Sequence, residues 1–269
     1  MLPQQPLSGK RFLVTRPEGQ GDRLVEGIRK LGGRAQHIPF LVIKPADDLS
    51  GLAKIAGQLD CYRACIFISA NAVNVAWPML SATHPNGWPN LVVAATIGPG
   101  TADVLKAHGI PQVVHPASRF DSEGLLAEAF FQADLCQGQA FALIRGEGGR
   151  DFLAQSLRDR GARVDEVAVY QRYLHPAALQ NLKTWLAEGE RDGAAPGTLL
   201  ISSSESLQGI MSSGDAELAA TLKHCPLLAP HPRIAETARQ LGFSHVAVSD
   251  GGDAGMLRYL QTYNEDNLA

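Results

Sequence analysis

The sequence predicts an α/β protein with two doubly wound parallel-sheet domains that are related by an internal duplication. Three observations lead to this fold class. The chain has 269 residues, more than one domain usually holds, so two domains are the natural expectation. Two long segments of the chain match each other. Predicted strands also alternate with predicted helices along the whole length, as they do in parallel sheets covered by helices.

The internal repeat relates residues 11–45 to residues 140–174, which align at a constant offset without a gap. The matches fall on charged, glycine and core positions, which are the positions that define a fold. They pair Phe12 with Phe141, Arg16 with Arg145, Glu18 with Glu147, Asp22 with Asp151, Leu24 with Leu153, Arg29 with Arg158, Gly32 with Gly161 and Arg34 with Arg163. So many matches at such positions indicate a duplication.

Each copy of the repeat predicts one β-loop-α-β unit. Residues 11–15 and 140–144 are short apolar runs typical of buried strands. Acidic loops follow, where the dipole of the next helix favours carboxylates. Apolar residues at helical spacing predict that helix: Leu24, Ile28 and Leu31 in the first copy, Leu153 and Leu157 in the second. Gly32 and Gly161 then stand where a left-handed C-cap is expected.

The remaining segments continue the alternation. Further predicted strands are residues 37–43, 65–69, 94–97, 113–114, 166–170, 198–202, 227–229 and 246–248. Two of the helices between them are expected to stop at Gly109 and Gly242. The polar stretch 186–197, which contains glycine and proline, is predicted to be a surface connection.

Composition excludes several classes of protein. The net charge of −3 and the pI of about 6.2 argue against a nucleic-acid-binding surface. No apolar run could span a bilayer, and residues 1–6 lack the apolar core of a signal peptide. The four cysteines lack the spacing of a zinc site and are expected to be reduced, mostly buried thiols: Cys61, Cys65, Cys136 and Cys225. We therefore expect a cytoplasmic protein that binds neither nucleic acid nor membrane.

Candidate site residues lie at the carboxyl ends of the predicted strands, where ligands of parallel sheets collect and helix N-termini supply N–H donors. These tips are residues 16–20, 69–71, 98–101, 145–150, 202–204 and 231–233. Ser69, Thr101 and Ser202 are predicted N-caps, and two roles stay open: they only cap, or they also help to bind carboxylates. Tyr170 ends a buried strand, and its hydroxyl faces either the core or a cleft at the seam between the repeats.

Nucleotide-binding motifs are incomplete in this chain. Residues 98–100 read GPG, but Asp103 stands where a dinucleotide fingerprint needs its third glycine. Residues 145–150 read RGEGGR with no Lys-Ser or Lys-Thr after them, so they predict no P-loop. His231 has no carboxylate partner in sequence and is interpreted as a loop or packing residue.

Five segments resemble the uroporphyrinogen-III synthase family, and the resemblance extends over nearly the whole chain. They are residues 14–17 (VTRP), 66–73 (IFISANAV), 97–102 (IGPGTA), 143–151 (LIRGEGGRD) and 169–170 (VY). The resemblance implies two flavodoxin-like domains, one inserted into the other, joined by a two-stranded β linker. One domain is then residues 1–40 plus 175–269, and the other is 41–174. The crossings would be 38–44 and 168–174, which suit a hinge.

The resemblance also implies an activity in the cleft between the domains. This is the cofactor-free cyclisation of hydroxymethylbilane to uroporphyrinogen III in tetrapyrrole and haem biosynthesis. Water is lost and the terminal pyrrole is inverted through a spirocyclic intermediate. Tyr170 matches the tyrosine assigned as general acid in the family. The implied substrate-binding residues are Arg16, Ser69, Ala70, Gly98, Thr101, Arg145, Ser202 and Ser203.

Several points stay open at this stage. Arg16 and Arg145 either bind substrate or pair internally with the acidic residues two positions further on. Ile234 stands at the second-copy counterpart of Thr101, where some relatives carry threonine, which argues against a mechanism with paired threonines. We expect a monomer that acts on the linear tetrapyrrole. Two questions stay open: whether the chain contacts the preceding pathway enzyme transiently, and which downstream branch of tetrapyrrole synthesis it serves.

Two alternative functions also fit a chain of two α/β lobes. One is a non-catalytic module that binds small anions, but such modules are normally exported and the N-terminus lacks a signal peptide. The other is a nucleotide-sugar transferase with two Rossmann-like lobes, which the incomplete glycine pattern opposes.

Overall fold

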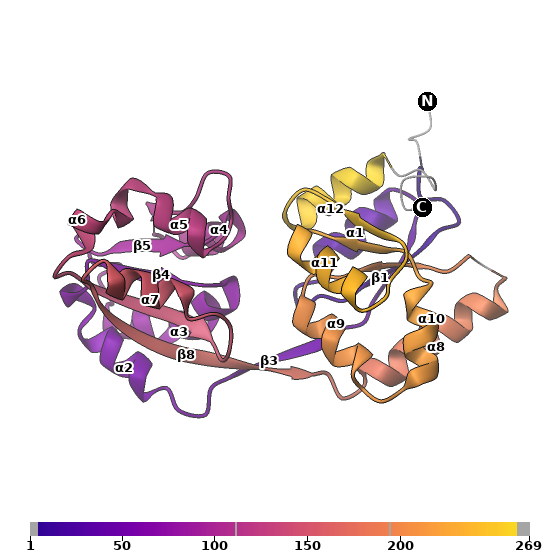
Figure 1. Cartoon of the computed structure of the whole chain (residues 1–269), viewed down its shortest axis with the longest axis horizontal. Helices are drawn as coiled ribbons and strands as arrows, with labels where there is room; N and C mark the ends of the chain where they lie inside the picture. Colours follow the sequence, from indigo (N-terminus) through magenta and orange to yellow (C-terminus); the bar gives the residue numbers. More distant parts are fainter. Residues whose placement is uncertain (1–4, 111, 194, 263–269) are drawn as a thin grey trace. The chain divides into compact units, whose positions relative to one another are not determined.

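A computed structural model describes residues 5–110, 112–193 and 195–262 of the chain. Residues 1–4, part of the stretch inspected for a signal peptide, lie outside the described residues. The chain divides into two compact units (Figure 1). Within the described residues, unit 1 comprises the residues up to Val42 and those from Tyr173 onward, and unit 2 comprises Ile43–Arg172. Unit 1 is therefore discontinuous in sequence.

The sheet of unit 1 has five strands. They are β1 (Arg11–Val14), β2 (Arg34–His37), β9 (Thr198–Leu200), β10 (Leu227–Ala229) and β11 (Val246–Val248). Their spatial order is β11-β10-β9-β1-β2, and all the pairs are parallel. Counted along the chain, this is the 2-1-3-4-5 order of a flavodoxin-like sheet.

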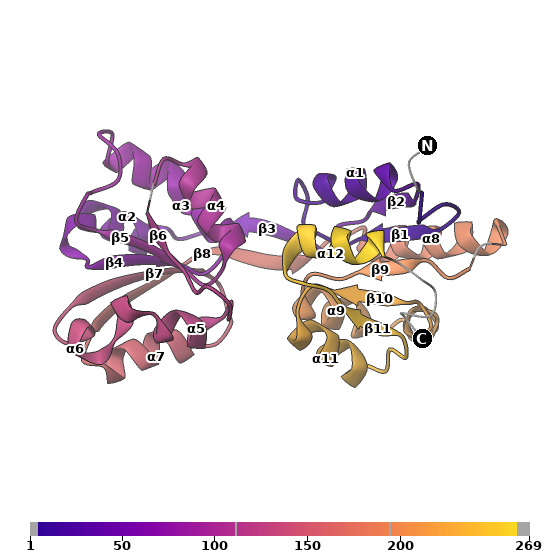
Figure 2. The same cartoon turned by 90° about the horizontal axis from the view of Figure 1, so that it is seen from above.

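Helices cover both faces of this sheet (Figure 2). One face carries α1 (Asp22–Lys30) and α12 (Gly252–Gln261). The other packs against α8 (Ala178–Arg191), α9 (Ser204–Met211), α10 (Ala216–Lys223) and α11 (Pro232–Gln240). Because successive side chains of a strand point to opposite faces, Phe12 and Val14 pack against α1 and α12, whereas Leu13 packs against α8 and α9.

The sheet of unit 2 has six strands. They are β3 (Leu41–Pro45), β4 (Ala64–Phe67), β5 (Val93–Thr96), β6 (Val113–Val114), β7 (Ala140–Gly146) and β8 (Arg163–Leu174). Their spatial order is β3-β8-β7-β4-β5-β6, and the pairs from β8 to β6 are parallel. If β7 is counted first, β8 to β6 follow the same 2-1-3-4-5 order as unit 1.

Unit 2 also has three layers (Figure 2). One face of its sheet packs against α2 (Ser50–Gly57), α3 (Ala70–Thr83) and α4 (Pro99–Ala107). The other packs against α5 (Ser122–Ala127), α6 (Ala133–Cys136) and α7 (Phe152–Asp159). Short 3₁₀ turns lie at η1 (Leu59–Cys61) and η2 (Ala129–Phe131). The predicted α/β class with two parallel sheets is confirmed.

Several local predictions can be compared with the structure. Gly32 and Gly161 follow α1 and α7 with φ of +88° and +79°, the left-handed conformation expected of them. The prediction of a surface connection over residues 186–197 is wrong for residues 186–191, because α8 continues to Arg191, and the connection to β9 begins only after it. Trp185 and Gly189 extend the buried stripe of that helix into the polar stretch.

The cysteines and the helix lengths were also predicted. Cys65, Cys136 and Cys225 are buried and Cys61 is exposed, all as free thiols, so the prediction of mostly buried thiols is confirmed. Among the described residues, no helix is both long enough and apolar enough to cross a lipid bilayer.

Candidate active site

Ser69 and Tyr170 meet at the carboxyl edge of the unit 2 sheet. Ser69 follows β4 and is the N-cap of α3, as predicted, and its Oγ accepts the N–H of Ala72 at 3.1 Å. The same Oγ lies 3.0 Å from the hydroxyl oxygen of Tyr170, which β8 supplies. Tyr170 is only 4% exposed, and its ring packs in the core beside α3. The structure therefore joins two of the predicted site residues by a hydrogen bond.

Gly146 makes room for this tyrosine. It pairs with Tyr170 where the β7–β8 register shifts at a bulge, and a Cβ at this position would lie 2.8 Å from the Tyr170 hydroxyl oxygen. The guanidinium of Arg172 lies 5.8 Å from the ring centre of Tyr170, a cation–π distance. Sequence analysis missed Gly146, because a glycine inside a glycine-rich loop gives no sign that it still belongs to a strand.

The start of α4 supplies further donors at the same edge. Gly98 is the N-cap and Thr101 lies inside the first turn, so the prediction of Thr101 as N-cap is wrong. The reason is Pro99, whose fixed φ and missing N–H suit the first helical position. Gly98 and Thr101 are half-buried, as is Ala70 in the first turn of α3. The first turns of both helices leave N–H groups without partners inside the helix.

Arg145 and Arg16 hold internal ion pairs. The Arg145 side chain is 13% exposed, and its Nη1 lies 2.9 Å from Asp151 Oδ1 and 3.2 Å from Glu166 Oε2. In unit 1, Arg16 Nη2 lies 2.6 Å from Asp253 Oδ1 on α12. Both arginines thus fix the loops that follow β7 and β1, and these partners are not the acidic residues two positions further on.

The carboxyl edge of unit 1 is built in a similar way. Ser203, and not the predicted Ser202, is the N-cap of α9, and its Oγ accepts the N–H of Ser206 at 3.3 Å. The helix starts later than predicted because Ile201 still bonds to β10, donating its N–H to Leu228 at 3.0 Å. Ser202 and Ser203 remain half-buried at this edge.

Two other residues of unit 1 had open roles. His231 is the N-cap of α11, with its Nδ1 accepting the N–H of Arg233 at 3.1 Å, so it is a capping residue. Ile234, the counterpart of Thr101, is 6% exposed and belongs to the core of unit 1.

Thr96 is a polar residue of unit 2 that the sequence analysis missed. It ends β5 and is fully buried, and its hydroxyl has no hydrogen-bond partner among the described residues. A threonine at the end of an otherwise apolar strand was the only available signal. In the described part of the chain, no group of three His, Cys, Asp or Glu residues could hold a metal ion.

Half-buried hydroxyls and helix N-termini at the carboxyl edges of parallel sheets are typical of the doubly wound α/β class of proteins, in which ligands bind at this edge. The family model described as uroporphyrinogen-III synthase HemD matches residues 22–257. The chain belongs to the uroporphyrinogen-III synthase family, which confirms the family that the sequence motifs indicated.

Several known relatives match over nearly their full length. A protein of Escherichia coli strain K12 named uroporphyrinogen-III synthase is 31% identical over 253 residues, which is 93% of this chain and 99% of that protein. A crystal structure of mutant uroporphyrinogen III synthase from the extremely thermophilic bacterium Thermus thermophilus has a TM-score of 0.58 at 17% identity, with 94% of this chain and 100% of that chain covered. The Helicobacter pylori uroporphyrinogen-III synthetase gives 0.52 at 14% identity, with 90% and 93% covered. These two structures show a shared fold.

Proposed function

We propose that this chain cyclises hydroxymethylbilane to uroporphyrinogen III, with loss of water and inversion of the terminal pyrrole, as a cytoplasmic monomer that needs no cofactor. Family membership supports the reaction. The observation that carries the mechanism is the hydrogen bond of 3.0 Å between Ser69 and Tyr170 at the carboxyl edge of unit 2.

This pair can deliver one proton. The Ser69 oxygen already accepts the N–H of Ala72, so one further lone pair and one proton are left on the hydroxyl. If Tyr170 donates to Ser69, the serine proton is available to the substrate. If Ser69 donates to Tyr170, the tyrosine proton is available. In both arrangements the pair acts as a general acid toward a substrate oxygen.

The reaction needs such a proton early and returns it later. The pyrrole nitrogen pushes electrons toward the hydroxymethyl carbon, its C–O bond breaks, and the leaving oxygen takes the proton from the pair to become water. Attack by the substituted α-carbon of the terminal pyrrole forms a spirocyclic C–C bond. The older bond from that carbon to its methylene bridge then breaks, and the free α-carbon of the now inverted pyrrole bonds to the released methylene. This α-carbon loses its proton, which restores the acid. The remaining task of the protein is to hold the chain so that closure occurs at the substituted carbon.

We propose that neutral donors bind the acetate and propionate groups of the substrate. In unit 2 these are Ser69, Thr101 and the backbone N–H groups near Ala70 and Gly98. In unit 1, the donors at the equivalent edge of the sheet are Ser202 and Ser203. Helix N-termini stabilise carboxylates without full positive charges. Arg16 and Arg145 add positive potential, while their ion pairs hold the loops in place.

We also propose that the two units are domains that arose by duplication, linked through β3 and β8. The support is a set of equivalent interactions. Arg29 donates to the Ala35 carbonyl at 3.1 Å, and its repeat partner Arg158 donates to the Val164 carbonyl at 3.2 Å. The strand registers agree as well, since Arg11 pairs with Arg34 as Ala140 pairs with Arg163.

The test supplies hydroxymethylbilane, oxidises the product and separates the porphyrin isomers. The wild-type chain is expected to yield the type III isomer, whereas unaided closure yields type I. Tyr170→Phe should lower the rate of type III formation by about a hundredfold, because it removes one member of the general acid pair. A wild-type chain that yields only type I would overturn the function.

Tyr62→Phe is the matched control. Tyr62 belongs to the same core, and its hydroxyl donates to Asp165 at 2.8 Å, but it precedes β4 and so lies at the opposite edge of the sheet. Its removal costs one partly buried hydrogen bond and should leave the isomer ratio and the rate unchanged. If Tyr170→Phe also keeps the wild-type rate, Tyr170 has no part in proton transfer.

A further inference from the structure

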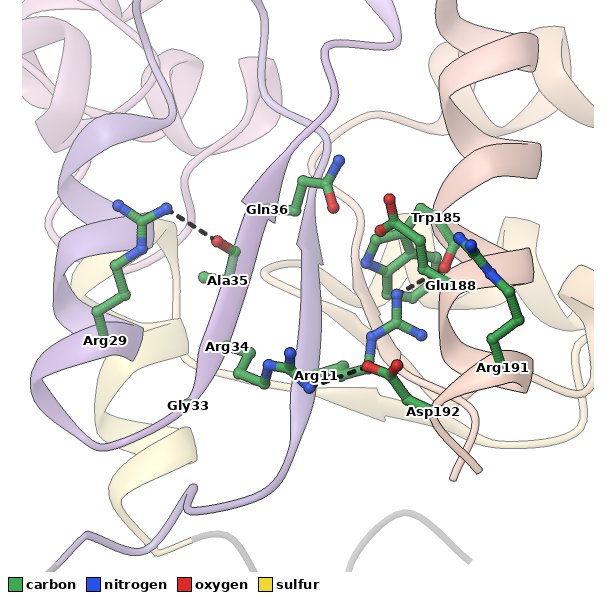
Figure 3. A pocket seen from close by; sticks show the side chains of 10 residues that line it. All are labelled: Arg11, Arg29, Gly33, Arg34, Ala35, Gln36, Trp185, Glu188, Arg191 and Asp192. Carbon is green, nitrogen blue, oxygen red and sulfur yellow. Dashed lines mark hydrogen bonds and ion pairs between the residues drawn. The ribbon is translucent and has the colours of Figure 1, made fainter. Parts of the chain in front are cut away.

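A cavity of about 590 Å³ lies in unit 1 at the amino ends of β1 and β2 (Figure 3). This is the sheet edge opposite to the one that carries Arg16 and Ser203. Side chains from the strands, from α1 and from α8 line the cavity, and its charged residues are Arg11, Arg29, Arg34, Arg191, Glu188 and Asp192. We call this cavity the arginine pocket. It has four cations and two carboxylates in a chain whose net charge is −3, so it is locally positive.

Arg11 is the central residue of the pocket. It is 9% exposed, its Nη2 donates to the Trp185 carbonyl at 2.6 Å, and its guanidinium carbon lies 4.7 Å from the Trp185 ring centre. Among the described residues, no carboxylate forms an ion pair with it. A buried cation without a counter-ion is costly, so a bound anion would supply a contact that the chain itself does not.

Gly189 leaves space for the guanidinium of Arg11. It lies in the interior of α8, where glycine is less favourable than alanine. A Cβ at Gly189 would collide with Nη1 of Arg11. The helix thus gives up intrinsic stability at the position where its backbone meets the guanidinium.

The other arginines keep donors for a ligand. Arg29 Nη2 donates to the Ala35 carbonyl at 3.1 Å, and Arg191 Nε donates to the Ala187 carbonyl at 3.3 Å. Arg34 pairs with Asp192 at 3.2 Å, but this pair is 68% and 49% exposed, so water competes strongly with it. A guanidinium has five N–H donors, and these contacts use only one or two on each side chain.

Helix dipoles explain part of this cluster. Both α1 and α8 end at this edge of the sheet, and basic residues are favoured in a last turn. That accounts for Arg29 and Arg191, but not for Arg11, which lies on a strand. Arg239 offers a comparison, because it lies in the last turn of α11 and donates to the Val246 carbonyl at 3.1 Å outside the pocket.

We propose that the arginine pocket is a second binding site of this chain, for a small molecule with at least two oxyanionic groups, carboxylates or phosphates. The planar forks of guanidinium groups match both kinds of oxyanion in a bidentate manner. The site stands on geometry in unit 1 alone and is independent of the proposed cyclisation.

Isothermal titration calorimetry of the full chain tests the site, with inorganic pyrophosphate as one probe and citrate as the other. Saturable binding at one site per chain is expected for at least one probe, and the stronger of the two identifies phosphate or carboxylate as the preferred group. Arg191→Gln should weaken that binding about tenfold, the usual scale for loss of one charge-assisted contact. Arg11→Gln should weaken it at least as much.

Arg239→Gln is the control, because it removes the same kind of last-turn arginine and should leave the affinity unchanged. The thermal midpoint of each variant shows that it is folded, and exposed Arg191 keeps the test valid if Arg11→Gln does not fold. Absence of saturable binding by either probe would overturn the site. An equal loss of affinity in Arg239→Gln and Arg191→Gln would show that the probe is attracted by positive charge in general. That result would also overturn the proposed site.

Discussion

The position of Tyr170 depends on the missing side chain of Gly146. A methyl group there would press on the tyrosine ring, which is held on its other side by the core. Gly146→Ala should therefore displace the hydroxyl from Ser69 and lower the rate of type III formation about tenfold or more. Overpacking of this kind also lowers the free energy of unfolding by about 1–3 kcal/mol. The isomer assay and denaturant unfolding measure the two effects.

Gly57→Ala provides the control for this prediction. Gly57 ends α2 in the same unit, and a Cβ there would meet no atom within 4 Å. This variant should keep both the rate and the stability of the wild type. If Gly146→Ala behaves as Gly57→Ala does, the tyrosine ring is not held by contact with residue 146.

At the residue scale, sequence patterns predicted where strands end better than they predicted which residue caps the following helix. Ser69 was predicted as an N-cap and is one. Thr101 and Ser202 were placed wrongly, because a helix start depends on which neighbour takes the first helical position and on how far the preceding strand stays paired. Gly146 escaped notice because a bulge between two distant strands has no local signature.

At the scale of elements, the start of α5 is held by charges. Asp121 is its N-cap and accepts the N–H of Gly124 at 2.8 Å. Burial raises the pKa of Asp121, but the hydrogen bonds from Arg119 and Gly124 outweigh this and hold it below its usual value. The hydrogen bond from Arg150 likewise lowers the pKa of Glu123. Both carboxylates thus favour the folded state when they are ionised.

Acidification should weaken this element. A carboxylate whose pKa is lower in the folded than in the unfolded state stabilises the protein above the unfolded value and ceases to do so as the pH falls through the folded value. The temperature of the thermal midpoint should therefore decrease as the pH drops below about 4, which is the ordinary pKa range of Asp and Glu. Arg150→Gln should make this fall shallower, because it removes the main cause of the low pKa of Glu123.

Arg239→Gln controls for loss of a surface arginine, since Arg239 bonds to a carbonyl and not to a carboxylate. Its acid profile should match that of the wild type. A profile of Arg150→Gln that also matches would show that the pair with Glu123 adds nothing to stability.

The elements themselves were mostly predictable. Short apolar runs and glycine stops located the strands and the helix ends, because burial and left-handed caps leave local marks. The helical part of residues 186–197 was mispredicted because polar residues surround the buried Trp185 and Gly189. The spacing of buried residues at every three to four positions, which continues the helix, was a better guide here than the polar composition.

At the scale of the whole molecule, the charge balance makes a prediction about salt. The chain carries a net charge of −3, and its proposed substrate is a polyanion. The two arginines among the proposed substrate-binding residues, Arg16 and Arg145, are held in ion pairs. Because their carboxylate partners cancel their charge at a distance, these arginines add positive potential only at short range, and long-range attraction of the substrate should be absent. From about 10 to 100 mM salt, over which the Debye length shortens from about 30 to 10 Å, kcat/KM should stay level or rise. A steep fall would indicate an unrecognised cationic path for the substrate.

The fold class was predictable at this scale from the alternation of strands and helices, whereas the strand order was implied only by the family resemblance. Alternation of strands and helices requires parallel sheets, but the position of β1 between β2 and β9 depends on contacts between residues far apart in sequence. A repeat in the sequence reduces the number of possible strand orders, because the two copies are expected to have the same order.

The interrupted sequence of unit 1 has a consequence for synthesis on the ribosome. Strand β1 emerges early, yet its neighbour β9 begins only at Thr198, after all of unit 2 has been translated. At ordinary elongation rates that delay is on the order of ten to thirty seconds. During this delay β1 lacks its hydrogen-bonding neighbour β9, and the face with Phe12 and Val14 can be covered by α1 but not by α12. The nascent chain therefore exposes an unpaired strand edge and apolar side chains, to which chaperones and neighbouring nascent chains can bind.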